Sequence, residues 1–231
     1  MKSWVEYWNS DHPIYVSERH KRVHAAAVGQ DILRQIHTSD AVVLDHGCGE
    51  ALYAEAVAAG CAKLFLCEAA PAVRQKLASR VAGIPATEVI DADAVAALED
   101  ASLDLVVANS LAQYLTSAQL IGLLDLWRRK LKPNGSLVIA DVVPPNVSPI
   151  TDAAALLRLG WQGGFLGAAL AGLVKTALSD YRRVRATLGF ATYSEAEFLA
   201  LLRANRFEGR RIRPNFGHNQ ARMAFRATPA P

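Results

Sequence analysis

Two glycines in the run from Val42 to Ala51 stand where a chain can hold a nucleotide-like ligand. An apolar stretch, Val42 to Leu44, leads into Gly47 and Gly49, and the residues that follow are typical of a helix. Glycine lets the backbone approach a ligand where a Cβ would collide, and the helix offers unpaired N–H groups to a polar or negative group. The run therefore predicts a cofactor-binding turn between a strand and a helix.

The spacing of this turn distinguishes between cofactors. A dinucleotide-binding turn has a third glycine or an alanine where this chain has Leu52. The turn instead resembles motif I of the class I S-adenosylmethionine-dependent methyltransferases, with Asp45 and the two glycines at the motif positions and Ala51 in place of the third glycine. The resemblance implies that Asp45 and the turn, Cys48 included, bind S-adenosylmethionine.

Strand and helix signals alternate from residue 41 to 143, which is the pattern of a parallel α/β sheet. Five strands are expected at 41–44, 63–67, 88–90, 103–108 and 136–143, with helices at 52–59, 71–81 and 117–131. A last strand pair is expected at 207–213 and 221–227. The resemblance implies a doubly wound α/β fold whose seven-stranded, mostly parallel sheet has an antiparallel last strand.

One methyltransferase domain is expected to span residues 1–231, with two helical additions. Residues 1–38 are expected to form an N-terminal helical cap, with a helix from about 17 to 36. Residues 146–190 are expected to form a helical insertion, or lid, after the fifth strand, because residues 151–184 are helical in composition.

Acidic residues follow the second and third expected strands. Glu68 ends the second strand, and it should lie beside the glycine turn because neighbouring parallel strands finish at the same edge of a sheet. The resemblance implies that Glu68 binds the ribose hydroxyls, with Ala69 beside it. It also implies that Asp91 and Ala92, after the third strand, contact the adenine. Asp93 is the alternative, although we expect it to cap a helix from 94 to 98.

Polar residues also follow the fourth strand. Asn109 and Ser110 stand where the family segment passes beneath the methionine part of the cofactor, which implies contacts with its amino group or with the acceptor. Gln113 and Tyr114 share that space if one helical turn follows, and we take both as candidates for acceptor binding. Tyr114 is equally well explained as a core aromatic residue.

Methyl transfer from a sulfonium is an in-line displacement in which a neutral thioether leaves without protonation, so alignment supplies most of the rate. A general base is needed only for a poor nucleophile such as a hydroxyl or a carbon acid. The candidates are His24, His218 and Tyr114, and the sequence does not select among them. In relatives by fold the helix before the first strand closes over the cofactor, so Arg19 or His24 is also expected to meet the cofactor carboxylate.

The segment from Leu159 to Val174 is unusually apolar, with one polar side chain in sixteen residues. It is too short to span a membrane easily, because a transmembrane helix needs about 20 apolar residues. Three interpretations stay open. The segment is a lid packed on the core, a homodimer contact, or a surface over 159–185 that meets a membrane or an apolar acceptor, since arginines follow at 182, 183 and 185.

Composition and charge limit the class of protein. The 231 residues are 52% hydrophobic and 20% charged, with a net charge of +3 that divides into −4 over residues 1–180 and +7 over 181–231. The basic part lacks the interleaved aromatic residues of single-strand binding platforms, so we expect no nucleic-acid partner. The absence of a signal-peptide pattern and of a C-x-x-C pair predicts a cytoplasmic protein without a metal site.

These observations favour an S-adenosylmethionine-dependent methyltransferase with a small, lipophilic acceptor. A non-catalytic S-adenosylmethionine-binding subunit is one alternative, because its cofactor site would look the same. An NAD-dependent oxidoreductase is the other, and Leu52 argues against it. No motif identifies the acceptor atom, whether oxygen, nitrogen, carbon or sulfur.

Overall fold

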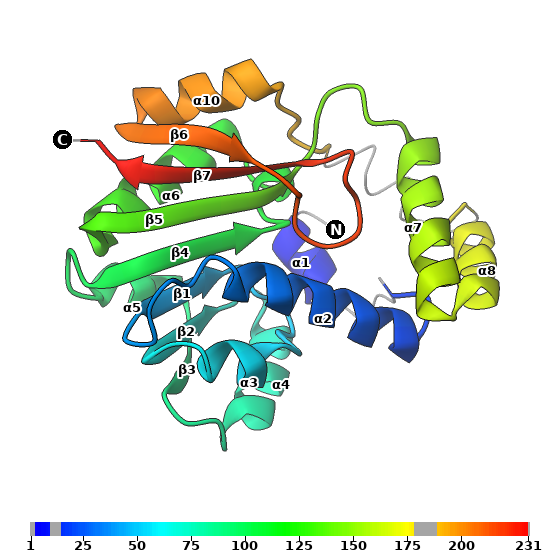
Figure 1. Ribbon diagram of the computed structural model, residues 1–231, viewed down its shortest axis with the longest axis horizontal. Coiled ribbons are helices and arrows are strands. Elements are labelled where there is room, and N and C mark those ends of the chain that lie inside the picture. The colour runs from blue at the N-terminus through cyan, green and yellow to red at the C-terminus, as the bar shows by residue number, and fades with distance from the viewer. Residues whose placement is uncertain (1–2, 10–14, 178–188, 231) are drawn as a thin grey trace.

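A seven-stranded sheet forms the centre of the computed structural model (Figure 1), which describes residues 3–9, 15–177 and 189–230. The strands are β1 (Val42–His46), β2 (Lys63–Cys67), β3 (Thr87–Ile90), β4 (Leu103–Asn109), β5 (Leu131–Val142), β6 (Phe207–Ile212) and β7 (Met223–Pro229). Their order across the sheet is β3, β2, β1, β4, β5, β7, β6. Strands β1 to β5 are parallel, and β7 is antiparallel to both β5 and β6. The predicted mostly parallel sheet with an antiparallel last strand is confirmed.

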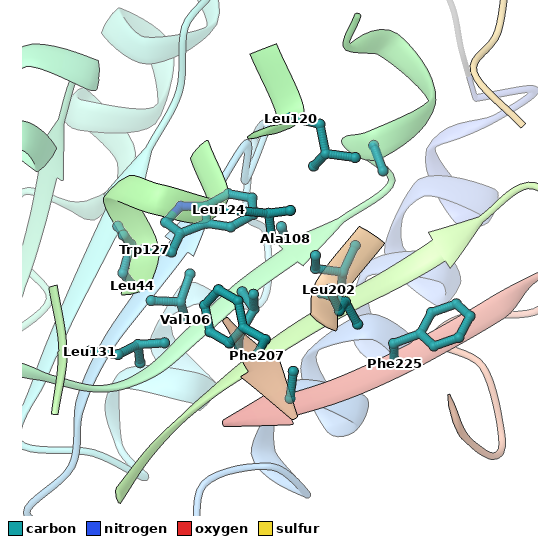
Figure 2. Packing of buried hydrophobic residues seen from close by; sticks show 14 of the residues in the cluster. Leu44, Val106, Ala108, Leu120, Leu124, Trp127, Leu131, Leu202, Phe207 and Phe225 are labelled. Carbon is teal, nitrogen blue, oxygen red and sulfur yellow. The ribbon is translucent and has the colours of Figure 1, made fainter. Parts of the chain in front are cut away.

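Helices cover both faces of this sheet (Figure 1). They are α1 (Trp4–Trp8), α2 (Glu18–Leu33), α3 (Ala54–Ala58), α4 (Pro71–Val81), α5 (Ala92–Ala97), the 3₁₀ turn η1 (Ala112–Tyr114), α6 (Ser117–Lys130), α7 (Pro149–Gly163), α8 (Leu166–Ala177) and α10 (Glu195–Ala204). Helices α2, α3 and α4 share one apolar core with the sheet, and α5, α6 and α10 share the other, part of which Figure 2 shows.

The central strands are apolar along their length because both of their faces are covered. Successive side chains of a strand point to opposite faces. Val43 belongs to the core beneath α2 and α3, its neighbour Leu44 belongs to the core beneath α6, and both are fully buried. Strands buried in this way read as continuous hydrophobic runs, which is why the sequence pattern located them.

The strand predicted at 136–143 begins earlier than expected, at Leu131, directly after α6. Leu131 pairs with Leu103, whereas Ser136 pairs with Leu105, so residues 132–135 form an irregularity in the ladder. Residues 132–135 therefore lie inside the strand and do not form a separate turn before it.

The helix predicted over residues 151–184 is divided into α7 and α8. Helix α7 ends at Gly164, whose φ of +70° lies in the left-handed region that glycine adopts most readily. The Phe165 N–H then donates to the Gly160 carbonyl at 2.8 Å, and α8 returns alongside α7 (Figure 1). Residues 178–184 of the predicted helix lie outside the described residues.

Helix α2 links the sheet to this helical hairpin. Its N-cap is Ser17, whose hydroxyl accepts the His20 N–H at 3.1 Å, so the helix predicted at 17–36 is slightly shorter. Helix α2 packs against α3 and against α7 (Figure 1). Within the described ranges no helix is long and apolar enough to cross a membrane.

Candidate active site

The glycine turn lies at the carboxyl end of β1 and is fixed to the end of β2. The N–H groups of Gly47 and Cys48 donate to the Cys67 carbonyl at 2.8 and 3.1 Å. Gly47 and Gly49 have φ values of +81° and +60°, which strain any residue with a side chain. A Cβ on Gly49 would meet nothing within 4 Å, so the turn leaves open space at this glycine.

Glu68 lies beside the turn, at the place the sequence predicts. Its Oε2 accepts the Gly49 N–H at 2.9 Å and its Oε1 accepts the Ala70 N–H at 2.8 Å. Arg74 donates to the Glu68 carbonyl at 2.8 Å and holds the backbone in place. Each carboxylate oxygen keeps a second lone pair, so the buried carboxylate can still accept hydrogen bonds from a ligand.

Asp45 is buried beneath the turn, where it forms a hydrogen bond that stabilises the fold. Its carboxylate accepts the hydroxyl of Tyr53, the N-cap residue of α3, at 2.5 Å. Burial raises the pKa of Asp45 to about 7, the Tyr53 hydrogen bond opposes this, and the nearby Glu68 adds to it. The carboxyl of Asp45 therefore fixes α3 against the end of β1.

Asp91, rather than Asp93, is the helix cap after β3. The Asp91 carboxylate accepts the Ala94 N–H at 3.0 Å, and α5 begins at Ala92. The prediction that Asp93 caps this helix is wrong, because the helix starts two residues earlier and leaves Asp93 exposed in its first turn. Asp91 also borders a hollow of about 560 Å³ between α4 and β3, where Arg74 lies as well.

The ends of β4 and β5 carry two residues in left-handed backbone conformations. Ser110 has a φ of +55° and Asp141 a φ of +62°. The Ser110 N–H donates to the Ala140 carbonyl at 3.1 Å, and the Ser110 hydroxyl donates to Asp141 Oδ2 at 2.7 Å. Non-glycine residues in this region are strained and cluster at functional sites.

An ion-pair cluster surrounds Asp141. Arg222 donates to Asp141 Oδ2 at 2.7 Å and reaches Asp152 of α7 at 3.3 Å. Asn219 donates to Asp152 at 2.7 Å, and Asn215 accepts the Asp141 N–H at 3.0 Å. The β6–β7 loop is thereby tied both to the end of β5 and to α7.

Three histidines from α2 and the β6–β7 loop stand next to this cluster. The His24 ring lies 5.5 Å from the His218 ring and 6.3 Å from the His20 ring, measured between centroids. Burial, followed by the neighbouring imidazoles, lowers the pKa of His20 and His24 to about 4, and burial also lowers the pKa of His218. The Nδ1 atoms of His24 and His218 are buried and find no hydrogen-bond partner within the described ranges.

Sequence reasoning named His24 and His218 but missed Asp141, Asp152, Arg222 and His20. Asp141 had a usable signal, because it is a single acidic residue near the carboxyl end of the buried strand β5. The others carry no local signal, since only the tertiary fold brings them together.

A known family model matches the part of the chain that holds the glycine turn. Residues 44–139 match a family model described as a methyltransferase domain, and this range includes the glycine turn, Glu68 and the end of β4. With this match and the strand order of its sheet, the chain is similar to the class I S-adenosylmethionine-dependent methyltransferases.

Solved structures share the fold of this chain at low sequence identity. Phosphoethanolamine N-methyltransferase 1 of Haemonchus contortus, with phosphoethanolamine and S-adenosylhomocysteine, is 16% identical over 99% of this chain and 47% of its own, with a TM-score of 0.63. Magnesium protoporphyrin IX methyltransferase of Synechocystis PCC 6803, with bound S-adenosylhomocysteine, is 15% identical over 97% and 92%, with a TM-score of 0.56. A complex of the Haloferax volcanii Trm112 methyltransferase activator with a methyltransferase gives 13% identity over 100% of both chains and a TM-score of 0.63. No curated protein sequence matches at a significant level.

The segment after β4 contacts the N-terminal cap. Tyr114 packs against Trp4, Trp8 and Phe190, with ring centroids 4.8 to 5.4 Å apart, as expected of a core aromatic residue. Gln113 is buried, and its Oε1 has no donor among the described residues. Gln113 is thus the residue of this turn whose side chain has unused hydrogen-bonding capacity.

The helical hairpin α7–α8 packs on the start of α2. Leu159, Phe165 and Ala169 form a small core with Val16 and Val23.

Arg19 belongs to the same junction. Its Nε donates to the carbonyl of Gly163, at the end of α7. The structure therefore uses Arg19 to join the cap helix to the hairpin, whereas His24 faces the site.

Proposed function

We propose that this chain binds S-adenosylmethionine where β1, β2, β3 and β4 end, and transfers its methyl group to a small, lipophilic acceptor. The residues proposed to hold the cofactor are Asp45, Gly47, Cys48, Gly49, Glu68, Ala69, Asp91, Ala92, Asn109 and Ser110. Gln113 and Tyr114 are proposed to border the acceptor. Asp45 contributes through the position of α3, as described above.

The contact between Gly49 and Glu68 carries this proposal. Two backbone N–H groups fix the Glu68 carboxylate beside a turn that leaves open space. Its remaining lone pairs suit a pair of adjacent hydroxyls, which is the chemistry of a ribose. S-adenosylhomocysteine, bound in two of the similar structures, contains such a ribose.

Buried oxygen atoms without donors also fit a ligand rich in N–H groups. Asn109 Oδ1 and Gln113 Oε1 are buried, and neither is hydrogen-bonded by a described residue. An unpaired buried acceptor costs about 1–3 kcal/mol, so a bound donor would stabilise both. The cofactor ammonium group and a polar end of the acceptor are donors of this kind.

When bound, the cofactor supplies an electrophilic methyl group, and the chain supplies alignment and a base. Holding the acceptor in near-attack geometry contributes roughly 7–11 kcal/mol. His24 or His218 takes the proton of a hydroxyl or N–H acceptor at its unpaired Nδ1. Both imidazoles are neutral at neutral pH because burial lowers their pKa.

The hairpin supports a lipophilic acceptor. Phe165, between α7 and α8, stacks on His20 with ring centroids 5.1 Å apart. The apolar hairpin therefore reaches the histidine cluster and gives the proposed acceptor space an apolar wall.

Two observations weigh against the alternatives. A dinucleotide-binding sheet has six parallel strands, whereas β7 here inserts antiparallel between β5 and β6. A non-catalytic cofactor-binding subunit explains Glu68 but gives no reason for the unpaired Nδ1 atoms of His24 and His218.

Two measurements test this function. Calorimetric titration with S-adenosylhomocysteine and with NAD should show binding of the first alone; binding of NAD alone would overturn the proposal. Transfer of a labelled methyl group should then be measured with a panel of phenols, amines, thiols and carbon acids. Cofactor binding without transfer to any member would favour the non-catalytic subunit.

We propose a cytoplasmic location, with membrane contact through residues 159–185, of which the structure describes 159–177. Ile150, Trp161, Leu170 and Val174 expose apolar side chains on α7 and α8. Flotation with anionic vesicles at low salt should carry the protein, and Trp161→Ser should weaken this binding. A protein that forms dimers in sedimentation and stays unbound by vesicles would instead support the homodimer contact.

A further inference from the structure

A hollow of about 310 Å³ lies where the end of α2 meets the edge strand β6 and its neighbour β7. It is lined by Asp31, Arg34, Gln35, Arg210, Ile212, Arg213, Pro214, Phe216 and Arg226. Four of these residues are arginines and one is an aspartate, which gives the lining a net charge of +3.

Two of the arginines are paired across the sheet. Arg210 and Arg226 are directly opposite each other on the antiparallel strands β6 and β7, so their side chains leave the same face. Like charges in this position destabilise a strand pair. Burial lowers the pKa of Arg226, and the charge of Arg210 lowers it further. The pairing has an unfavourable energy that a bound anion would offset.

The contacts of Arg226 do not neutralise this charge. Its guanidinium bonds Ser136 Oγ at 2.9 Å, His37 Nε2 at 2.7 Å and Gln35 Oε1 at 3.4 Å. None of these three acceptors carries a negative charge.

Among the described residues, the carboxylates near the hollow form no ion pair with Arg210, Arg213 or Arg226. Asp31 accepts both the Arg34 side chain and the Gly217 N–H, the latter at 2.7 Å. Glu208 lies two residues before Arg210 on β6, yet within the described ranges it forms no ion pair with any arginine. Arg210 and Arg213 likewise have no carboxylate partner among the residues described.

We propose that this hollow binds a compact, phosphate-bearing ligand through Arg210, Arg213 and Arg226. Guanidinium groups bind phosphate oxygens through paired N–H donors and match the charge of the group. The volume suits a small molecule. The arginines surround one hollow instead of following a stripe, as the backbone of a nucleic-acid strand would require.

The site is separate from the candidate active site but shares the β6–β7 loop with it. Phe216 lines the hollow, and the next residue, Gly217, lies against His24, where an added Cβ would be 3.2 Å from His24 Cε1. A ligand in the hollow therefore has a nearby reporter, the imidazole signal of His24.

Titration with inorganic pyrophosphate at constant ionic strength tests the proposal. The full-length protein should bind it saturably, with a rise in melting temperature. Arg210→Gln and Arg226→Gln should each weaken binding about tenfold or more, since each removes a charged hydrogen-bond partner. Arg210→Gln should also raise the melting temperature without pyrophosphate, because it removes the like-charge pair.

Arg203→Gln is the matched control, because Arg203 is an exposed arginine on α10, which packs on the opposite face of β6. It should change pyrophosphate affinity less than twofold. No saturable binding by the wild type, or equal weakening by Arg203→Gln, would overturn the proposal. Tight binding of single-stranded RNA that pyrophosphate does not displace would also overturn it, in favour of a nucleic-acid surface. If Arg226→Gln does not fold, Arg210→Gln, which changes an exposed side chain, decides the test.

Discussion

The hydroxyl of Ser110 donates a 2.7 Å hydrogen bond to Asp141 Oδ2, and both residues have left-handed backbones at the ends of neighbouring strands. Arg222 donates to the same oxygen at 2.7 Å. A strained conformation persists only where its surroundings determine it, and here the partly buried guanidinium of Arg222 and the hydroxyl of Ser110 hold Asp141 in place. The two strand ends, and any ligand they bind, therefore depend on a residue from β6–β7.

Replacing Arg222 with glutamine should destabilise the protein by up to about 3–5 kcal/mol, because it leaves the partly buried carboxylates of Asp141 and Asp152 beside an uncharged group. Chemical denaturation at neutral pH measures this change. Arg128→Gln is the control, since Arg128 forms a more exposed pair with Asp125 worth at most about 1 kcal/mol. Equal losses in the two variants would show that the Arg222 cluster has no special role.

Replacing Glu68 with glutamine should weaken S-adenosylhomocysteine binding about 10- to 100-fold, because a charged acceptor of ligand hydrogen bonds is lost. Calorimetry measures the affinity, and circular dichroism checks that the turn still folds. Glu55→Gln, an exposed change in the first turn of α3, should leave the affinity within about twofold. An unchanged affinity in the Glu68 variant would remove this residue from the cofactor site.

Gly29 of α2 lies against Tyr53, the N-cap residue of α3. A Cβ at this position would lie 2.5 Å from the Cβ of Tyr53, an atom fixed to the backbone. Helix propensity favours alanine by up to about 1 kcal/mol, but overpacking costs about 1–3 kcal/mol, so Gly29→Ala should be destabilising. Gly122 in α6 has nothing within 4 Å, so Gly122→Ala should stabilise the protein by up to about 1 kcal/mol. Thermal unfolding measures the change in stability of both variants. If Gly29→Ala and Gly122→Ala change the stability in the same direction, the close contact between Gly29 and Tyr53 is contradicted.

The sheet and its glycine turn were predictable because their signals are local. Buried parallel strands are apolar runs, and Glu68 follows one of them at the edge where β1 also ends. The start of α5 was misjudged by two residues, because Asp91 and Asp93 have the same chemistry and only the backbone shows which one caps the helix. His24 and His218 were named singly, but their juxtaposition depends on the β6–β7 loop folding back onto α2.

Asp45 gives the protein a characteristic dependence of stability on pH. Its pKa is raised by burial to about 7 in the folded state, so the folded protein holds this proton more tightly than the unfolded chain does. Asp45 therefore contributes fully to the stability of the folded protein below about pH 4. This contribution, about 4 kcal/mol in total, is lost as the pH rises to about 7. In Asp45→Asn the group cannot ionise, so the unfolding free energy of the variant should gain on the wild type across this range. Denaturant titrations at pH 4 and pH 7 measure the difference, and a constant difference would mean that folding does not raise the pKa of Asp45.

We expect the pair of His24 and His218 to determine how the rate of catalysis depends on pH. Burial holds the pKa of His24 near 4 and lowers that of His218, so either candidate base is still neutral at pH 6.5. The rate of methyl transfer to a hydroxyl acceptor should therefore fall only below pH 6.5, and near pH 4 if His24 is the base. If His24 is the base, His24→Gln should lower kcat by about 10²- to 10⁴-fold, and if His218 is the base, His218→Gln should do so. In either variant the affinity for S-adenosylhomocysteine should stay unchanged. His37→Gln, an exposed change outside this pair, should keep the wild-type kcat. If His24→Gln and His218→Gln both retain the wild-type kcat and pH profile, neither imidazole accepts the proton, and alignment alone accounts for the transfer.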